Sequence, residues 1–207
     1  MTILQGLHMA IALYLKLFFL LTPFFVLSTF LTITAGTDVN LKQRLAVRIA
    51  LGTAGVTLII FFFGVWIMKI FGITVDAFRT GSGVLLLLVA VSLVYGPQNQ
   101  KMDFKKENLM DLAIVPLAVP ITAGPATLGA LMVLGLETPL LSGKIITVVS
   151  LLGAVASIGA MLYYSERIEK MLGRASISIL SKITGLILSA IAAQMIVIGV
   201  RQLWFTP

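Results

Sequence analysis

Long apolar stretches alternate with short clusters of charged and polar residues along the chain. A helix rises 1.5 Å per residue, so about 20 apolar residues are needed to cross the hydrocarbon core of a bilayer. The pattern predicts an all-α integral membrane protein with six transmembrane helices, of which the third is short. The expected spans are Met9–Ile33, Ala46–Met68, Thr80–Tyr95, Leu112–Leu136, Ile145–Tyr164 and Ile183–Trp204.

Composition strengthens the membrane assignment and excludes several classes of function. Hydrophobic residues make up 59% of the 207 residues and charged residues 11%, against about 45–50% and about 25% in soluble domains. The longest polar run, Gln98–Asn108, is too short for a soluble domain. The absence of cysteine excludes disulfides and thiolate sites, and a single histidine cannot form a metal cluster. The lipid bilayer is therefore the expected partner, and the net charge of +7 indicates membrane orientation rather than binding to nucleic acid.

The distribution of lysine and arginine predicts how the chain is oriented. Six spans place both termini on one side of the membrane, and the first, third and fifth loops hold ten cationic residues against five in the opposite set. By the positive-inside rule, these three loops are cytoplasmic and both termini face the periplasm or the extracellular side. We expect a multi-pass protein of the cytoplasmic (inner) membrane. The ten cytoplasmic cations are Lys42, Arg44, Arg48, Lys101, Lys105, Lys106, Arg167, Lys170, Arg174 and Lys182.

Two local similarities predict a 3+3 inverted repeat. Thr22-Pro23 in the first span matches Val119-Pro120 in the fourth, and Arg79–Leu85 in the third matches Lys182–Leu188 in the sixth. Because each half has three spans, the second half enters the membrane from the opposite side, as in many transporters. The expected organisation is a first three-helix repeat over residues 1–97, a cytoplasmic linker over 98–110 and a second repeat over 111–207.

Helix-breaking residues are concentrated in the fourth span, where Pro116, Pro120, Gly124 and Pro125 occur within ten residues. Proline removes a helical hydrogen bond and clashes with the preceding turn. In hydrocarbon an unwound backbone must line a cavity or be buried in protein. Pro23 alone favours a plain structural kink, but a matching break in both halves is typical of a transporter binding site.

Half-helix N-termini can bind a carboxylate, while unwound carbonyls and hydroxyls can receive an ammonium group or a small cation. Together these groups suit a small zwitterion with a modest side chain. Gln194 lies inside the sixth span, where an interhelical hydrogen bond and a cavity-lining role are equally compatible with the sequence. Lys16 is expected to extend its stem to the outer interface. The candidate substrate-binding residues are Thr22, Pro23, Ser28, Thr29, Pro120, Thr122, Ala123, Gly124, Pro125, Thr127 and Gln194.

All eight acidic residues lie in loops or at span ends, which disfavours a proton pump based on carboxylates. No cofactor is expected. A coupling ion, Na⁺ or H⁺, would have to be bound by backbone carbonyls, by hydroxyls or by the carboxylate of Asp111 at a span end. Within the spans there are no paired carboxylates and no metal-ligand spacing, and a GxxxxGK[ST] phosphate loop is absent from the chain, so we expect neither an enzyme nor an ATPase.

The segment Val115–Pro125, preceded by Phe78–Gly83 and followed by Ile183–Leu188, resembles the MarC family over nearly the whole chain. The resemblance implies a six-span bacterial or archaeal membrane protein, and some family members are described as transporters of glycine and alanine. The first span departs from the family pattern, which usually has Asn or Asp before the proline, glycine two residues after it and a second proline five residues on. This chain has Thr22, Phe25 and Ser28 at or near those places.

The leading hypothesis is a secondary transporter of small neutral amino acids that works by alternating access about the broken first and fourth spans. The alternative is a non-transporting structural or regulatory membrane subunit whose kinks only shape a packing surface. It is favoured by the few polar residues at mid-span. The oligomeric state, including a homo-oligomer, is left open.

Overall fold

The computed structural model describes residues 3–95, 124–138 and 140–205, and these residues form helices and short connections. Five helical stretches among them are long and apolar enough to cross a membrane, and α5 is a shorter apolar helix. The linker predicted over 98–110 and the first part of the fourth predicted span lie outside the described residues. The helices are α1 (Ile3–Leu20), α2 (Pro23–Ile33), α3 (Val39–Ile70), α4 (Val75–Tyr95), α5 (Pro125–Glu137), α6 (Leu141–Tyr163) and α7 (Ser165–Phe205).

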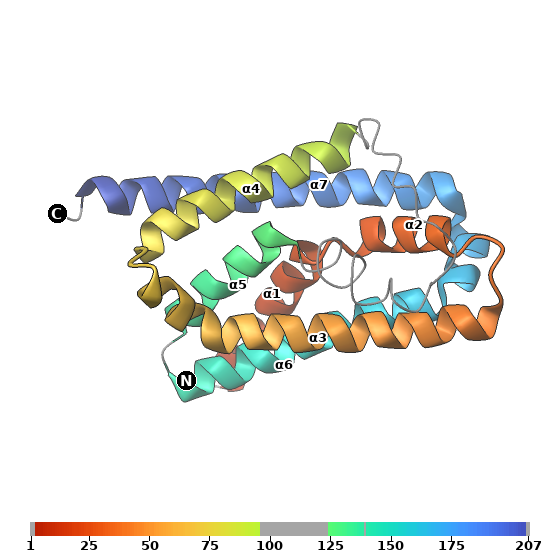
Figure 1. Cartoon of the computed structure of the whole chain (residues 1–207), viewed down its shortest axis with the longest axis horizontal. Coiled ribbons are helices and arrows are strands. Elements are labelled where there is room, and N and C mark those ends of the chain that lie inside the picture. The colour runs from red at the N-terminus through yellow and green to blue at the C-terminus, as the bar shows by residue number, and fades with distance from the viewer. Residues whose placement is uncertain (1–2, 96–123, 139, 206–207) are drawn as a thin grey trace.

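The helices are arranged in three layers (Figure 1). The outer layers are the pair α4 and α7 and the pair α3 and α6, and each pair is in contact. Between them lie α1, α2 and α5. Each of these middle helices contacts both outer layers, α1 and α2 through α6 and α7, and α5 through α3 and α4.

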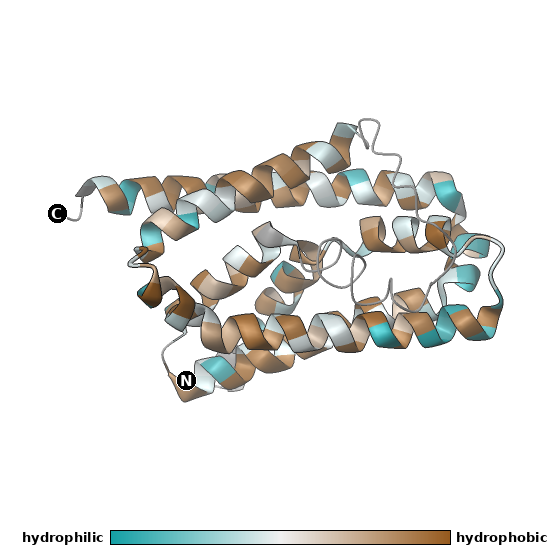
Figure 2. Ribbon diagram, in the orientation of Figure 1, coloured by the Kyte–Doolittle hydropathy of each residue, from teal (hydrophilic) through white to brown (hydrophobic). Residues whose placement is uncertain are grey.

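The first predicted span forms the centre of the core. Leu21, Val26, Leu27 and Phe30 of this span are completely buried. By contrast, large apolar side chains such as Phe63 on α3 are exposed on the outer surface. Hydrophobic residues cover the length of the helices, and many of the hydrophilic ones gather toward their ends (Figure 2). This distribution matches a bundle whose sides contact lipid.

Helices α1 and α6 run parallel and are joined by hydroxyl groups. Ser150 Oγ donates to the Ala10 carbonyl at 3.1 Å, and the Tyr14 and Ser157 hydroxyls are 2.8 Å apart. A hydroxyl that finds a partner across two helices avoids leaving a polar group in hydrocarbon. These contacts fix α1 against the outer layer.

The fifth predicted loop differs from the expectation. Its cations lie within α7, which begins at Ser165 and contains a break at Gly173, where φ is +74° and ψ is 158°. Glycine adopts this conformation because it has no Cβ. The hydropathy pattern predicted the start of the apolar span at Ile183. Helix α7 begins earlier, at Ser165, and its first part is rich in charged residues. Lys42 of α3 pairs with Glu166 of this segment at 2.8 Å.

Close packing of α4 against α7 depends on glycine. A Cβ added at Gly83 would lie 2.8 Å from Ile196 Cγ1 and 3.1 Å from the Ala192 carbonyl oxygen. Near the other end of the pair, a Cβ at Gly185 would lie 2.9 Å from the Ala90 carbonyl oxygen. The order of these contacts shows that the two helices run antiparallel. Small residues at such interfaces let helix backbones approach closely.

We expect Gly83→Leu to lower the free energy of unfolding by about 1–3 kcal/mol, because the new side chain would overlap Ile196 and the backbone of α7. Gly81→Leu is the matched control, since a Cβ at Gly81 meets no atom within 4 Å. Thermal unfolding of both variants in detergent tests the expectation. Equal melting temperatures would show that the glycine contact does not limit this interface.

Candidate functional site

The break in the first span is centred on Thr22. Helix α1 ends at Leu20, and α2 begins at Pro23, so that the proline occupies the first turn of α2. Thr22 between them has φ 49° and ψ 56°, the left-handed conformation. The proline ring disfavours a helical residue before it, and a β-branched residue with positive φ is a strained exception. Strain of this kind concentrates at ligand sites and switch regions.

The start of α5 lies within the fourth predicted span and is directly bonded to the break at Thr22. Gly124 caps α5 in an extended conformation, and Pro125 occupies its first turn. Thr127, 5% exposed, donates its hydroxyl to the Leu20 carbonyl at 3.1 Å. The positive end of the α5 dipole therefore lies beside the negative end of α1. A carbonyl released by one broken helix is satisfied by a side chain of the other.

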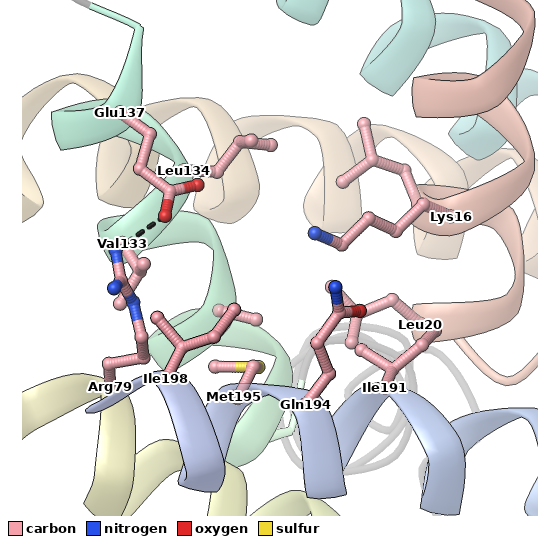
Figure 3. A pocket seen from close by; sticks show the side chains of 12 residues that line it. Lys16, Leu20, Arg79, Val133, Leu134, Glu137, Ile191, Gln194, Met195 and Ile198 are labelled. Carbon is pink, nitrogen blue, oxygen red and sulfur yellow. Dashed lines mark hydrogen bonds and ion pairs between the residues drawn. The ribbon is translucent and has the colours of Figure 1, made fainter. Parts of the chain in front are cut away.

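A cavity of about 170 Å³ adjoins this contact and is lined by residues of α1, α4, α5 and α7. It extends from Leu20, at the break, to Glu137, the last residue of α5. Figure 3 shows Lys16 and Gln194 reaching toward one another from different helices, with Glu137 and Arg79 on the opposite side. Its lining residues are Lys16, Leu17, Leu20, Arg79, Ala130, Val133, Leu134, Glu137, Ile191, Gln194, Met195 and Ile198.

Arg79 connects three elements at one side of the cavity. Its guanidinium donates to Glu137 of α5 at 2.5 Å and to the amide oxygen of Gln202 on α7. Asp76, one turn earlier on α4, lies 3.5 Å away. The Arg79 side chain is 8% exposed, whereas that of Glu137 is 46% exposed. The network neutralises Arg79 and leaves the Glu137 carboxylate accessible.

The sequence profile of the MarC family of integral membrane proteins matches residues 7–204. The chain belongs to the MarC family. It is 34% identical over 190 residues to the UPF0056 membrane protein MJ1677 of Methanocaldococcus jannaschii, covering 90% of this chain and 93% of that one. It is also 24% identical to YhcE of Escherichia coli, covering 92% and 91%, and 25% identical to YvbG of Bacillus subtilis, covering 92% and 93%. No solved structure matches the chain.

This MarC protein is thus an integral multi-pass membrane protein, and its structure brings several of the predicted site residues together. Thr22 and Pro23 are buried at the first break, while Gly124, Pro125 and Thr127 form the start of α5.

The other predicted residues are distributed differently. Ser28 and Thr29 lie one to two turns into α2 and are partly buried, and they do not line the cavity. Gln194 is exposed and does line it, at a distance from the break. Pro120, Thr122 and Ala123 lie outside the described residues.

Sequence reasoning missed the charged half of the site in this MarC chain. The sequence placed Arg79 among the cations of the non-cytoplasmic side and Glu137 among the acids at span ends. It predicted that Lys16 extends to the outer interface. In the structure all three line one cavity. One signal was available for Arg79, because it begins the third-span segment that matches the sixth span. Nothing in the local pattern links Lys16 to Glu137.

We expect Thr127→Val to lower the free energy of unfolding by about 1 kcal/mol, because the Leu20 carbonyl would lose its donor while side-chain shape is retained. Thr184→Val is the control: the Thr184 hydroxyl is also buried but donates within α7 to Leu180. Thermal unfolding of the two variants gives the comparison. A loss as large in the control would mean that bonding between the breaks adds no stability.

Arg79→Met is expected to cost about 2 kcal/mol, because it removes hydrogen bonds to a carboxylate and to an amide from a buried group. Arg174→Met is the control, since its pair with Glu169 involves a side chain that is 70% exposed. Exposed pairs contribute about 0–1 kcal/mol. Unfolding by urea or by heat in detergent measures the loss of stability in each of the two variants. Similar losses would contradict the bridging role of Arg79.

Proposed function

We propose that this protein is a secondary transporter of small neutral amino acids such as glycine and alanine, acting by alternating access across the cytoplasmic membrane. The observation that carries the proposal is the contact between the break at Thr22 and the start of α5, where Thr127 donates to the Leu20 carbonyl beside a cavity with both polar and apolar lining residues. Discontinuous helices that meet inside a bundle are the usual setting of a transporter binding site.

The size and lining of the cavity favour a small zwitterion. Its volume of about 170 Å³ is below the roughly 300–1,000 Å³ of pockets that hold drug-sized ligands. Lys16 occupies one part of the wall and the Arg79–Glu137 pair another, and aliphatic side chains such as Leu17 form much of the rest. A glycine or alanine molecule has charges of both signs and little apolar bulk, which matches this wall.

The helix contacts support the inverted repeat that alternating access requires. An inverted repeat would relate α1 and α2 to α5, α3 to α6, and α4 to α7. Under this correspondence, the contact between α1 and α6 in the structure is matched by the contact between α5 and α3. The contact between α2 and α7 is likewise matched by the contact between α5 and α4. In Figure 1, α2 and α5 extend from the centre of the molecule in opposite directions. We propose that the two halves are related in this way.

The proposed orientation places the cavity on the outer side of the breaks. Both chain ends are drawn on the left of Figure 1, where α5 ends and α6 begins. The predicted cytoplasmic cations Lys42 and Arg167 belong to helix starts at the opposite end of the molecule. The positive-inside rule assigns the Lys42 end to the cytoplasm. Substrate would then enter this cavity from the periplasmic or extracellular side.

We propose a non-enzymatic role without a cofactor, and a coupling ion is to be identified by experiment. Purified protein in proteoliposomes is expected to show saturable uptake of radiolabelled glycine, alanine or serine, tested under Na⁺ and H⁺ gradients in both directions. Thr127→Val is expected to reduce the rate more than Thr184→Val, because only Thr127 joins the two breaks.

Binding gives an independent measurement. A ligand held only by the folded state stabilises a protein by about 2.7 kcal/mol at a hundredfold excess over its dissociation constant. If none of the three amino acids is transported or stabilises the protein, the proposal fails and the structural or regulatory subunit becomes the better account.

A further inference from the structure

Lys16 is the charged residue of the cavity to which the described part of the chain supplies no carboxylate partner. It lies one turn before the end of α1, in a stretch that is apolar enough to span a membrane. No acidic side chain among the described residues lies within ion-pair distance of its ammonium group. A charge inside a membrane span is costly and, as a rule, marks a functional site.

The two cationic residues of the cavity, Arg79 and Lys16, differ in how far acidic side chains compensate their charges. Arg79 is offset by Glu137 at 2.5 Å and by Asp76 at 3.5 Å. No carboxylate of residues 3–95, 124–138 or 140–205 offsets Lys16, so among these residues its part of the cavity wall carries an excess positive charge. In Figure 3 its ammonium group points into the cavity toward the amide of Gln194, which comes from α7. An ammonium and an amide that converge on one space form a donor pair for an anionic group.

We propose that Lys16 and Gln194 bind the α-carboxylate of the transported amino acid; this inference rests on the proposed function. The Glu137 carboxylate, which is paired with Arg79 and 46% exposed, provides acceptor oxygens on the far wall for the ammonium group of a zwitterion. Leu20, whose carbonyl accepts the bond from Thr127, and Ala130, which follows Thr127 on α5, also line the cavity. A carboxylate held by Lys16 would therefore lie about one helical turn from the break.

The first experiment compares ligands on the unmodified protein. Affinities of alanine and alaninamide, which keeps the ammonium group but lacks the carboxylate, are measured by thermal stabilisation in detergent. Alanine is expected to bind about 10- to 100-fold more tightly, the usual effect of a charge-assisted hydrogen bond. Equal affinities would overturn the proposal without any substitution being made.

The second experiment assigns the effect to Lys16. Lys16→Met keeps the apolar stem and is expected to weaken alanine binding by about 10- to 100-fold while leaving alaninamide binding unchanged. Lys16→Arg keeps the charge and is expected to retain most of the affinity. Lys144→Met is the matched control, because Lys144 begins α6 at the same end of the molecule and does not line the cavity.

The outcomes separate this inference from the proposed function. If the unmodified protein binds alanine and Lys16→Met binds it equally well, carboxylate recognition by Lys16 is wrong and transport of amino acids still stands. If the unmodified protein binds no small neutral amino acid, both fail. If Lys16→Met does not fold, the comparison of alanine with alaninamide and the Lys16→Arg variant decide the question.

Discussion

Hydrocarbon offers no hydrogen-bond partners, so a helix that breaks inside a membrane must find partners for its freed backbone groups within the protein. The break at Thr22 releases the Leu20 carbonyl, and Thr127 at the start of α5 satisfies it. This one bond ties the two discontinuous segments together at the centre of the bundle. Helices α1 and α5 meet at that contact, and the cavity lies beside it.

The same constraint explains where charge is placed. Arg79 is tolerated as a buried cation because Glu137, Asp76 and Gln202 surround its guanidinium. These partners come from α4, α5 and α7, so neutralising one charge also fixes three helices around the cavity. Lys16 has no such compensation from the carboxylates that the structure describes. This difference between the two cations is the basis for the proposed binding of an anionic group at Lys16.

The outer layers supply a frame for these middle helices. Gly83 and Gly185 let α4 and α7 approach closely, and hydroxyl contacts join α1 to α6. The broken helices are thus held between two pairs of long helices. In the proposed alternating access, a binding site at the breaks would be exposed in turn to each side by movement of one repeat against the other. The matching contacts of α1 with α6 and of α5 with α3 are compatible with such a movement.

The sequence alone determined the class of protein, most span positions and the break at Pro23, because hydropathy and proline geometry act over a few residues. It also identified Thr127 by its place beside Pro125. Only the tertiary structure decided that Thr127 bonds to Leu20, that Ser28 lies away from the cavity, and that Lys16 shares it with Glu137. The physical reason is distance along the chain: these groups are more than 100 residues apart, and only the packing of four helices determines which of them meet.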